Sequence, residues 1–354
     1  MWALVPCFDS RTIGGFLESG ILATCFLFIY RQGCQSVKPN ETAKVNPKVV
    51  DVMSGEREHF LKAQQKLLDR YGVEVESKFV DIPSIRGRAQ VLITGKGPAL
   101  VIINGIGTPA AMWSPLMAKI NGYRLFAVDL PGYGLTDTIP GFTDNLRSSA
   151  VTFLEEACLA LSLEQPVFLA NSMGSLWTSW LALDHPERVA ALVHIGCPAV
   201  VLDTSAPLQM RLLSVKLLGR LLTRLQPPSP KQVEQLSKMV NQYPMVPELV
   251  ELLVATERLP GFRRMFLSTL NTLLRLGGNR DEMRLTKSQL AGIEQPTLLL
   301  WGNNDPFGST HVAEQVQKTL PDARLHTVDG GHAPWLNDTD KIGRITETFL
   351  GELG

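Results

Sequence analysis

One serine of the chain stands in a sequence context that suits nucleophilic catalysis. Ser172 breaks a short apolar segment within residues 168–174, and its neighbours two positions away on either side, Ala170 and Gly174, are both small. A nucleophile on a strained turn between a strand and a helix needs this spacing, because a larger side chain at either position would collide with the neighbouring backbone. We therefore predict a nucleophile elbow at Ser172, although a serine that only caps a helix would share the local pattern.

Two segments downstream of Ser172 carry the other groups that a serine nucleophile requires. The hydroxyl needs an imidazole to take its proton and a carboxylate to orient that imidazole. An apolar run within residues 297–306 ends in a polar loop with Asp305, and a glycine-rich loop after a further apolar run carries His332. We predict that Asp305 is the carboxylate and His332 the base.

The order of these three residues along the chain resembles that of the α/β-hydrolases. The resemblance extends over residues 73–353, and three separated motifs in the right order are far more specific than one. It implies a serine hydrolase of the esterase or carbon-carbon hydrolase type, in which Ser172 attacks the substrate, His332 moves the proton and Asp305 holds the imidazole.

A loop upstream of the serine resembles the oxyanion loop of the same family. Residues 99–107 form an apolar run that ends in a glycine turn, with Asn104 in place of the usual histidine. The resemblance implies that the backbone amides of Ile106 and Met173 hold the developing oxyanion, a contribution of about 3 to 4 kcal/mol per donor. Backbone donors survive a change of side chain at residue 104.

Each member of the predicted triad has a rival. Asp305 precedes a proline and could belong to a turn, and Asp203 follows the preceding strand, where some members of the family place the acid. We favour Asp305. Asp329 and Asp340 lie near the base in sequence but on the wrong side of a strand-loop junction. The remaining histidines lack a comparable context and are interpreted as structural: His59, His185, His194, His311 and His326.

The elements that must position these residues follow from the hydrophobic pattern. Short apolar runs alternate with longer amphipathic ones, which predicts a mostly parallel sheet with helices on both faces. Together with the resemblance, this gives an α/β-hydrolase fold in which an eight-stranded sheet is flanked by helices and a helical cap is inserted after strand 6. We expect strands near residues 74–81, 88–94, 98–104, 123–129, 166–171, 189–196, 296–301 and 323–328.

One long stretch interrupts the alternation. Residues 198–290 are rich in leucine and proline, and we interpret them as a helical cap over the site. Residues 53–197 and 291–354 are then the two parts of the hydrolase core, and residues 1–52 are an N-terminal extension.

The predicted cap differs from the rest of the chain in charge. Residues 205–290 contain nine arginines and four lysines against five glutamates and one aspartate, an excess of seven positive charges in a chain whose total is zero. In a helix predicted over residues 208–225, Lys216, Arg220 and Arg224 share one face opposite most of the leucines. From the sequence we interpret these three as an ordinary solvated face.

Arg211 falls inside the apolar face of the same predicted helix, where a charge is costly without a partner. We hypothesise that it binds a substrate carboxylate or an acid of the cap. Trp335, three residues beyond His332, is expected to border the site and to contact substrate.

Composition excludes several classes of protein. With 45% hydrophobic and 19% charged residues, the chain can bury a large core. Lysine plus arginine and aspartate plus glutamate both total 34, which argues against a nucleic-acid partner. The five cysteines form no CxxC pair and no zinc-binding spacing, and the chain has no phosphate loop or dinucleotide motif, so that neither a metal nor a cofactor is implied.

The N-terminal part carries an apolar run at residues 20–30, and extending it back to residue 12 crosses Glu18. This is marginal for a membrane span, which needs about 20 residues. One hypothesis is membrane contact through residues 12–30, with the basic residues that follow keeping the catalytic domain cytoplasmic. The other is that an amphipathic helix starts near Met53 and that the preceding residues are a mere extension or a wrongly assigned start.

Three classes of function follow. Our prediction is a cytoplasmic serine hydrolase that cleaves a small or medium carboxylic ester or related acyl bond, with a small-molecule acyl substrate as its partner. The alternatives on the same triad are carbon-carbon bond hydrolysis and acyl transfer. A non-catalytic member of the fold could instead bind a small ligand under the cap. A scaffold role would be favoured by a broken triad, which the sequence does not show.

Overall fold

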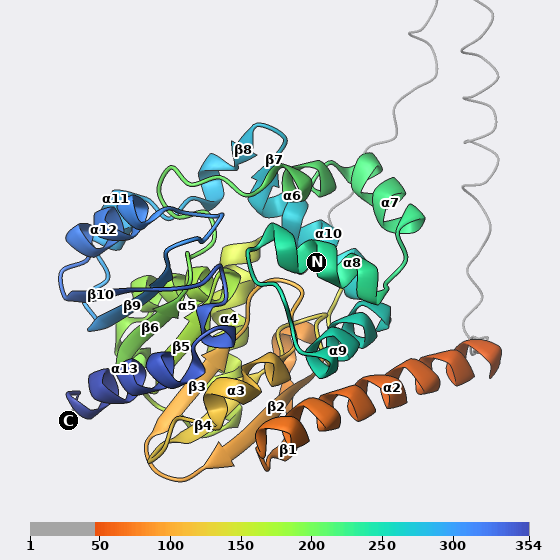
Figure 1. Ribbon diagram of the computed structural model, residues 1–354, viewed down its shortest axis with the longest axis horizontal. Coiled ribbons are helices and arrows are strands. Elements are labelled where there is room, and N and C mark those ends of the chain that lie inside the picture. Colours follow the sequence, from red (N-terminus) through yellow and green to blue (C-terminus); the bar gives the residue numbers. More distant parts are fainter. Residues whose placement is uncertain (1–46, 354) are drawn as a thin grey trace, which may run out of the picture. The chain divides into compact units, whose positions relative to one another are not determined.

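All eight segments predicted as strands form one sheet in the structure, a computed structural model that describes residues 47–353, with side chains from residue 55 (Figure 1). The strand order is β1-β2-β4-β3-β5-β6-β9-β10. The strands are β1 (Glu76–Ile82), β2 (Gly87–Gly95), β3 (Ala99–Ile103), β4 (Arg124–Val128), β5 (Val167–Asn171), β6 (Ala191–Ile195), β9 (Thr297–Gly302) and β10 (Ala323–Val328).

The sheet is mostly parallel, as predicted. Only β2 runs antiparallel to its neighbours β1 and β4, whereas β4, β3, β5, β6, β9 and β10 all run in the same direction. The carboxyl ends of these six strands therefore meet at one edge of the sheet, which is where open α/β sheets place their ligands.

Helices cover both faces of the sheet, and alternation along the strands explains why. In β3, Val101 and Ile103 belong to one buried cluster, while Leu100 and Ile102 belong to another on the opposite face. The first cluster includes helices α4 (Leu146–Ala160), α5 (Met173–Asp184) and α12 (Thr310–Thr319). The second includes α2 (Pro47–Tyr71), α3 (Ser114–Met117) and α13 (Thr339–Gly351).

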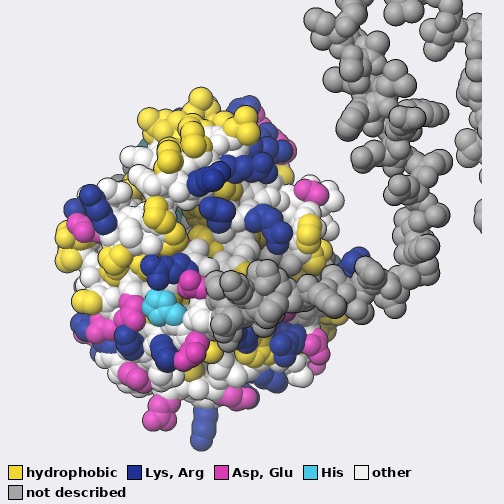
Figure 2. Space-filling model, turned by 90° about the vertical axis from the view of Figure 1, so that its right-hand side faces the viewer, with side chains coloured by type: hydrophobic (Ala, Val, Ile, Leu, Met, Phe, Trp, Pro, Cys, Tyr) yellow, Lys and Arg dark blue, Asp and Glu magenta, His cyan; other side chains and the backbone are white. Residues whose placement is uncertain are grey.

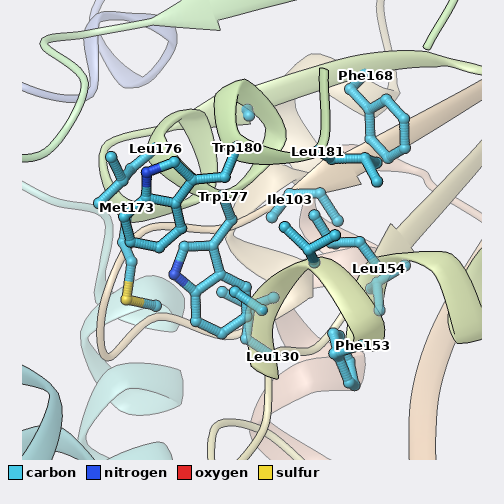
Figure 3. Close-up of a cluster of buried hydrophobic side chains, with 14 of the residues drawn as sticks. Ile103, Leu130, Phe153, Leu154, Phe168, Met173, Leu176, Trp177, Trp180 and Leu181 are labelled. Carbon is cyan, nitrogen blue, oxygen red and sulfur yellow. The ribbon is translucent and has the colours of Figure 1, made fainter. Parts of the chain in front are cut away.

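The first cluster is built around the helix that starts at the predicted elbow. Trp177 and Trp180 of α5 are buried, and Phe153 of α4 lies at 73° to the ring of Trp177 with 6.4 Å between the centroids. Figure 3 shows these rings packed with Leu154 against residues of the sheet. The large apolar area buried here fixes the position of α5 against the sheet.

The cap lies between β6 and β9 and is mainly helical. It consists of α6 (Leu208–Leu213), α7 (Lys216–Leu225), α8 (Pro230–Met239), α9 (Pro247–Arg258), α10 (Phe262–Leu273) and α11 (Lys287–Leu290), with a small hairpin of β7 (Leu274–Arg275) and β8 (Gly278–Asn279). The sequence pattern did not indicate this hairpin.

The single helix predicted over residues 208–225 is wrong, because the chain breaks it into α6 and α7. Ser214 follows the end of α6, and its hydroxyl donates to the carbonyl of Arg211. An added Cβ at Gly219 would lie 2.2 Å from the carbonyl oxygen of Leu213, so that α7 turns back closely against the end of α6. Such a backbone contact is possible only for glycine.

Helix α2 links the start of the described chain to the cap. Lys66 and Arg70 of this helix pair with Glu251 and Glu248 of α9, at 2.7 and 3.2 Å. The helix begins at Pro47, so the domain boundary expected between residues 52 and 53 falls inside it. The apolar run at residues 20–30 lies outside the described residues, and no helix within residues 47–353 is long and apolar enough to cross a membrane.

Replacing Phe153 by alanine tests the packing of α4 on α5. We expect Phe153→Ala to lower the free energy of unfolding by about 3 to 5 kcal/mol, because a fully buried aromatic ring is lost from a packed core. Leu159 on the same helix is 58% exposed, and Leu159→Ala should change stability by less than about 0.5 kcal/mol. Urea denaturation followed by tryptophan fluorescence measures both. Equal effects of the two variants would contradict the packing described.

Candidate active site

Ser172 occupies a turn of unusual backbone conformation between β5 and α5. Its φ is 55° and its ψ is −113°, a combination that side-chain-bearing residues rarely adopt. The spacing that suggested an elbow has a direct steric cause at Gly174, where an added Cβ would lie 2.5 Å from the carbonyl oxygen of Ile103 and 2.6 Å from that of Asn104. The serine therefore stands on a tight turn held against the end of β3.

Asp305 and His332 come together at the same edge of the sheet. The Asp305 carboxylate lies in the loop after β9, and its Oδ2 is 2.9 Å from Nδ1 of His332 in the loop after β10. The same Oδ2 accepts a hydrogen bond from the amide of Cys197 at 2.8 Å, and Oδ1 accepts one from the amide of Phe307 at 2.9 Å. With both oxygens fixed, the carboxylate holds the imidazole with Nδ1 as its donor.

The other imidazole nitrogen is available to accept a proton. Nε2 of His332 is buried and has no hydrogen-bond partner among the residues that the structure describes. His332 and Ser172 line the same cavity. The structure thus brings the three residues expected to form the triad to one site, although no hydrogen bond joins the serine hydroxyl to Nε2. Catalytic hydrogen bonds often tighten only when substrate binds.

Asn171 is a site residue that the sequence analysis missed. Its Nδ2 donates to the carbonyl of Ile195 at 2.6 Å and to the carbonyl of His332 at 3.0 Å. An added Cβ at Gly196 would lie 2.3 Å from the same His332 carbonyl. The residue before the serine thus ties the histidine loop to the end of β6. Its position directly before the predicted nucleophile, Ser172, was the only available signal in the sequence.

The cap also holds the histidine loop. The amide of His332 donates to the carbonyl of Val240 at 3.1 Å, and the amide of Ala333 donates to Oε1 of Gln242 at 2.9 Å. An added Cβ at Gly331 would lie 2.4 Å from the Val240 carbonyl. These contacts join the segment after α8 to the expected base, and nothing in the local sequence indicates them.

The expected oxyanion loop lies beside the serine. The amide of Ile106 donates to no acceptor of the described chain, and Met173 is the first residue of α5, whose amide has no partner within the helix. Asn104 braces this loop, because its Oδ1 accepts from Nε1 of Trp113 at 2.6 Å and its Nδ2 donates to the carbonyl of Thr108 at 3.1 Å. The asparagine therefore supports the turn in place of a histidine.

The structure gives the rival residues partners other than the triad. The side chain of Asp203 is 94% exposed and pairs with Arg284 at 3.2 Å. Burial lowers the pKa of His194 to about 3, and its ring faces the hydroxyl of Thr178 at 3.3 Å, which fits a neutral structural histidine. Asp329 accepts a hydrogen bond from Asn303 at 2.7 Å.

Two residues expected to contact substrate are placed elsewhere. Arg211 does not line the cavity, and its Nη1 donates to the carbonyl of Leu276 at 3.1 Å, with no carboxylate of the described chain in ion-pair range. The prediction placed Arg211 on the apolar face of one continuous helix, whereas the helix breaks at Ser214. Trp335 is buried and stacks on Trp113 at 4.0 Å, so that it belongs to the core below the site.

The cavity above Ser172 has a volume of about 1290 Å³ and is closed on one side by the cap. Its wall is largely apolar, with Met210, Leu213, Leu253 and Phe266 among the residues that the cap supplies. Burial raises the pKa of Glu257 on the same wall, which favours its neutral form. The cavity is large enough for a substrate with a sizeable apolar part.

Neither a metal nor a reactive thiol is indicated at the site. Within the described part of the chain, no group of three or more His, Cys, Asp or Glu side chains could hold a metal ion. Burial and the nearby Asp305 raise the pKa of the Cys197 thiol well above its usual value, so that it stays protonated. Cys197 contributes its backbone amide instead.

The chain is similar to known hydrolases. The family model for the alpha/beta hydrolase fold matches residues 98–339. A pimeloyl-[acyl-carrier protein] methyl ester esterase of Shewanella woodyi is 28% identical over 259 residues, which cover 70% of this chain and 92% of the relative. A 2-hydroxy-6-oxononadienedioate/2-hydroxy-6-oxononatrienedioate hydrolase of a Pseudomonas species is 26% identical over 286 residues, covering 77% and 96%. The structure of a carboxylesterase from Bacillus subtilis superimposes with a TM-score of 0.67 and 21% identity, covering 84% of this chain and 98% of that one.

The two rival acids can be told apart by paired substitutions. We expect Asp305→Asn to lower kcat by about 10⁴-fold with little change in KM, because the amide would favour the wrong imidazole tautomer. Asp203→Asn removes a carboxylate that is 94% exposed and pairs with Arg284, and we expect its kcat to stay unchanged. Steady-state kinetics on one ester measure both, and a larger effect at Asp203 would reverse the assignment.

Asn171 is expected to act by positioning the histidine loop. Asn171→Ala removes both hydrogen bonds that its Nδ2 donates, so we expect kcat to fall on the order of 10²-fold while KM changes little. Asn121→Ala, at an exposed asparagine in the loop before β4, serves as the control. Hydrogen exchange of the loop around His332 should quicken only in Asn171→Ala. A pure rise in KM would contradict this role.

Proposed function

The chain belongs to the alpha/beta hydrolase fold family, and from that premise we propose that Ser172, His332 and Asp305 cleave a carboxylic ester or related acyl bond through an acyl-enzyme intermediate. The observation that carries the proposal is the joint placement of these residues: a serine on a strained turn shares a cavity with an imidazole whose other nitrogen is held by a carboxylate at 2.9 Å.

The first half of the reaction forms the acyl-enzyme. The hydroxyl oxygen of Ser172 attacks the substrate carbonyl while Nε2 of His332 takes its proton. The imidazolium that forms is stabilised by Asp305, which accepts from Nδ1. The negative charge on the carbonyl oxygen is met by the amides of Ile106 and Met173, which have no competing acceptor among the residues that the structure describes. Collapse of the intermediate expels the alcohol, which takes the proton from Nε2.

The second half of the reaction releases the acid. Water enters the cavity and gives a proton to Nε2 of His332 as its oxygen attacks the acyl carbonyl. The same two amides hold the second oxyanion, and Ser172 leaves with the proton returned by the imidazole. The proposed steps need the side chains and amides named here, the substrate and one water molecule.

The cavity favours an acyl group of some length. Its volume of about 1290 Å³ exceeds the range of roughly 300 to 1,000 Å³ that is usual for small ligands, and the cap supplies an apolar wall. Burial of acyl methylenes should contribute about 0.8 kcal/mol each. We therefore propose a medium-length acyl substrate.

We also propose that the catalytic domain lies in the cytoplasm, because basic residues follow the apolar N-terminal run.

Carbon-carbon bond hydrolysis is a second candidate, and one observation favours it. Arg258, Arg263 and Arg264 all line the cavity, which suits a substrate with carboxylates. The relative from Pseudomonas is named for hydrolysis of a dienedioate, a dicarboxylate. The same three catalytic groups would serve this reaction. Turnover of such a hydroxy-oxo dienedioate, but not of esters, would favour carbon-carbon bond hydrolysis over the first candidate.

A chain-length series of p-nitrophenyl esters tests the proposal on the full chain. We expect turnover to rise from the acetate to medium-length acyl groups, because each added methylene is buried against the cap. Ser172→Ala should lose essentially all turnover and all labelling by a fluorophosphonate, since the hydroxyl that would form the acyl-enzyme is removed.

Ser205→Ala provides the matched control, because Ser205 lies at the start of the cap and does not line the cavity. It should keep both turnover and labelling. Labelling of Ser172 without turnover of any ester would support the carbon-carbon candidate. If a folded chain shows neither turnover nor labelling, catalysis is rejected and a ligand-binding member of the fold is favoured.

A further inference from the structure

Exposed apolar side chains gather on the cap, outside the cavity. Ten large hydrophobic side chains are exposed among the described residues, and five of them fall within residues 208–225. A sixth exposed side chain, Leu276, lies in the turn between β7 and β8. This turn is close to α6, because Arg211 of α6 donates to the carbonyl of Leu276. We call this surface the cap patch, made of Leu208, Val215, Leu217, Leu221, Leu225 and Leu276.

Helix α7 presents the central stripe of the cap patch. Leu217, Leu221 and Leu225 are spaced four residues apart and therefore lie on one side of the helix. Their exposed fractions are 80%, 53% and 67%. Leucines so exposed and so aligned form a continuous apolar surface, which usually marks an interaction site.

Basic side chains form a second stripe beside the leucines. At 100° per residue, Lys216, Arg220 and Arg224 lie next to the leucine stripe on the exposed side of α7. None of these three pairs with a carboxylate of the described chain, whereas Arg275 and Arg284 near the hairpin do, with Asp281. Figure 2 shows hydrophobic side chains at the upper end of the molecule and Lys and Arg side chains directly below them.

The third side of α7 belongs to the cavity. Leu222 and Thr223 line it, as do Arg263 and Arg264 at the start of α10. A partner bound to the cap patch would therefore lie next to the cavity that holds Ser172.

We propose that the cap patch docks on a membrane surface rich in anionic phospholipid. The three leucines of α7 enter the boundary between headgroups and acyl chains, and Lys216, Arg220 and Arg224 meet the lipid phosphates. This combination of an apolar stripe and a basic stripe on one short helix is what an interfacial helix requires. The inference concerns docking alone and does not depend on the reaction.

Other occupants fit the patch less well. In a symmetric dimer the same surfaces face each other, so that three cations would oppose three cations. Residues 1–46 of the chain carry four basic and three acidic side chains, and so offer no net negative charge to match the three cations. An acidic protein would meet the cations but leave the protruding leucines unexplained.

Hydrogen exchange on the full chain tests the proposal at α7 itself. Exchange of residues 214–227 is measured without lipid, with vesicles of phosphatidylcholine, and with vesicles of phosphatidylcholine mixed with phosphatidylglycerol. We expect the mixed vesicles to slow these amides by about tenfold and pure phosphatidylcholine to slow them much less. Because the signal comes from α7, vesicle binding through another part of the chain cannot produce it.

Two variants separate the contributions of leucines and charges. Replacing Leu217, Leu221 and Leu225 by serine should abolish the slowing, and replacing Lys216, Arg220 and Arg224 by glutamine should abolish its dependence on phosphatidylglycerol. Leu159→Ser, at a leucine of α4 that is 58% exposed, is the matched control and should behave like the wild type. All three variants should hydrolyse a soluble ester at the wild-type rate, which verifies their fold.

Four outcomes would overturn the proposal. Exchange at α7 could be unchanged by either kind of vesicle. Slowing that grows with protein concentration in the absence of lipid would assign the patch to a second copy of the chain. Slow exchange without lipid at every concentration would assign it to another segment of the same chain. Slowing by soluble polyglutamate as strong as by the mixed vesicles would assign it to an acidic protein.

Discussion

The backbone of the loop after β10 packs directly against the ends of β5 and β6, and this contact decides where His332 can lie. Its carbonyl accepts from Asn171 and comes so close to Gly196 that a Cβ there would lie 2.3 Å away. A side chain at that position would push the loop outward and separate the imidazole from Asp305. The proposed catalysis thus depends on direct contact between the backbone of the histidine loop and the backbone at Gly196, with no side chain between them.

The strained turn at Ser172 is possible because the elements on either side of it are firmly held. A φ of 55° at a serine costs of order 1 to 3 kcal/mol, and the turn persists only when its surroundings leave no alternative. Before the turn, β5 is a central strand with partners on both sides. After it, the buried rings of Trp177 and Trp180 anchor α5. The hydrophobic core therefore supplies the energy that keeps the serine exposed to the cavity.

The parts of the structure that the sequence could predict are those with a local cause. Buried strands are apolar runs ended by turn residues, and the small residues around Ser172 reflect sterics within a few positions. The positions of Arg211 and Trp335 could not be predicted in this way. The first depends on a helix break at Ser214 and the second on a stacking partner, Trp113, more than two hundred residues away in the chain. Features of this kind produce no periodic pattern in the sequence.

The hydrogen bonds between the cap and the histidine loop link substrate binding to the proposed catalysis. Val240 and Gln242 follow α8, which lines the cavity through Val233 and Leu236, and they bind the backbone of His332 and Ala333. A ligand that displaces α8 must therefore also strain or release the loop that carries the proposed base. The fit of a substrate under the cap would then govern the alignment of Nε2 with Ser172, so that substrates of the wrong shape would lose turnover as well as affinity. In such an arrangement the cap contributes to the chemical step although none of its side chains takes part in it.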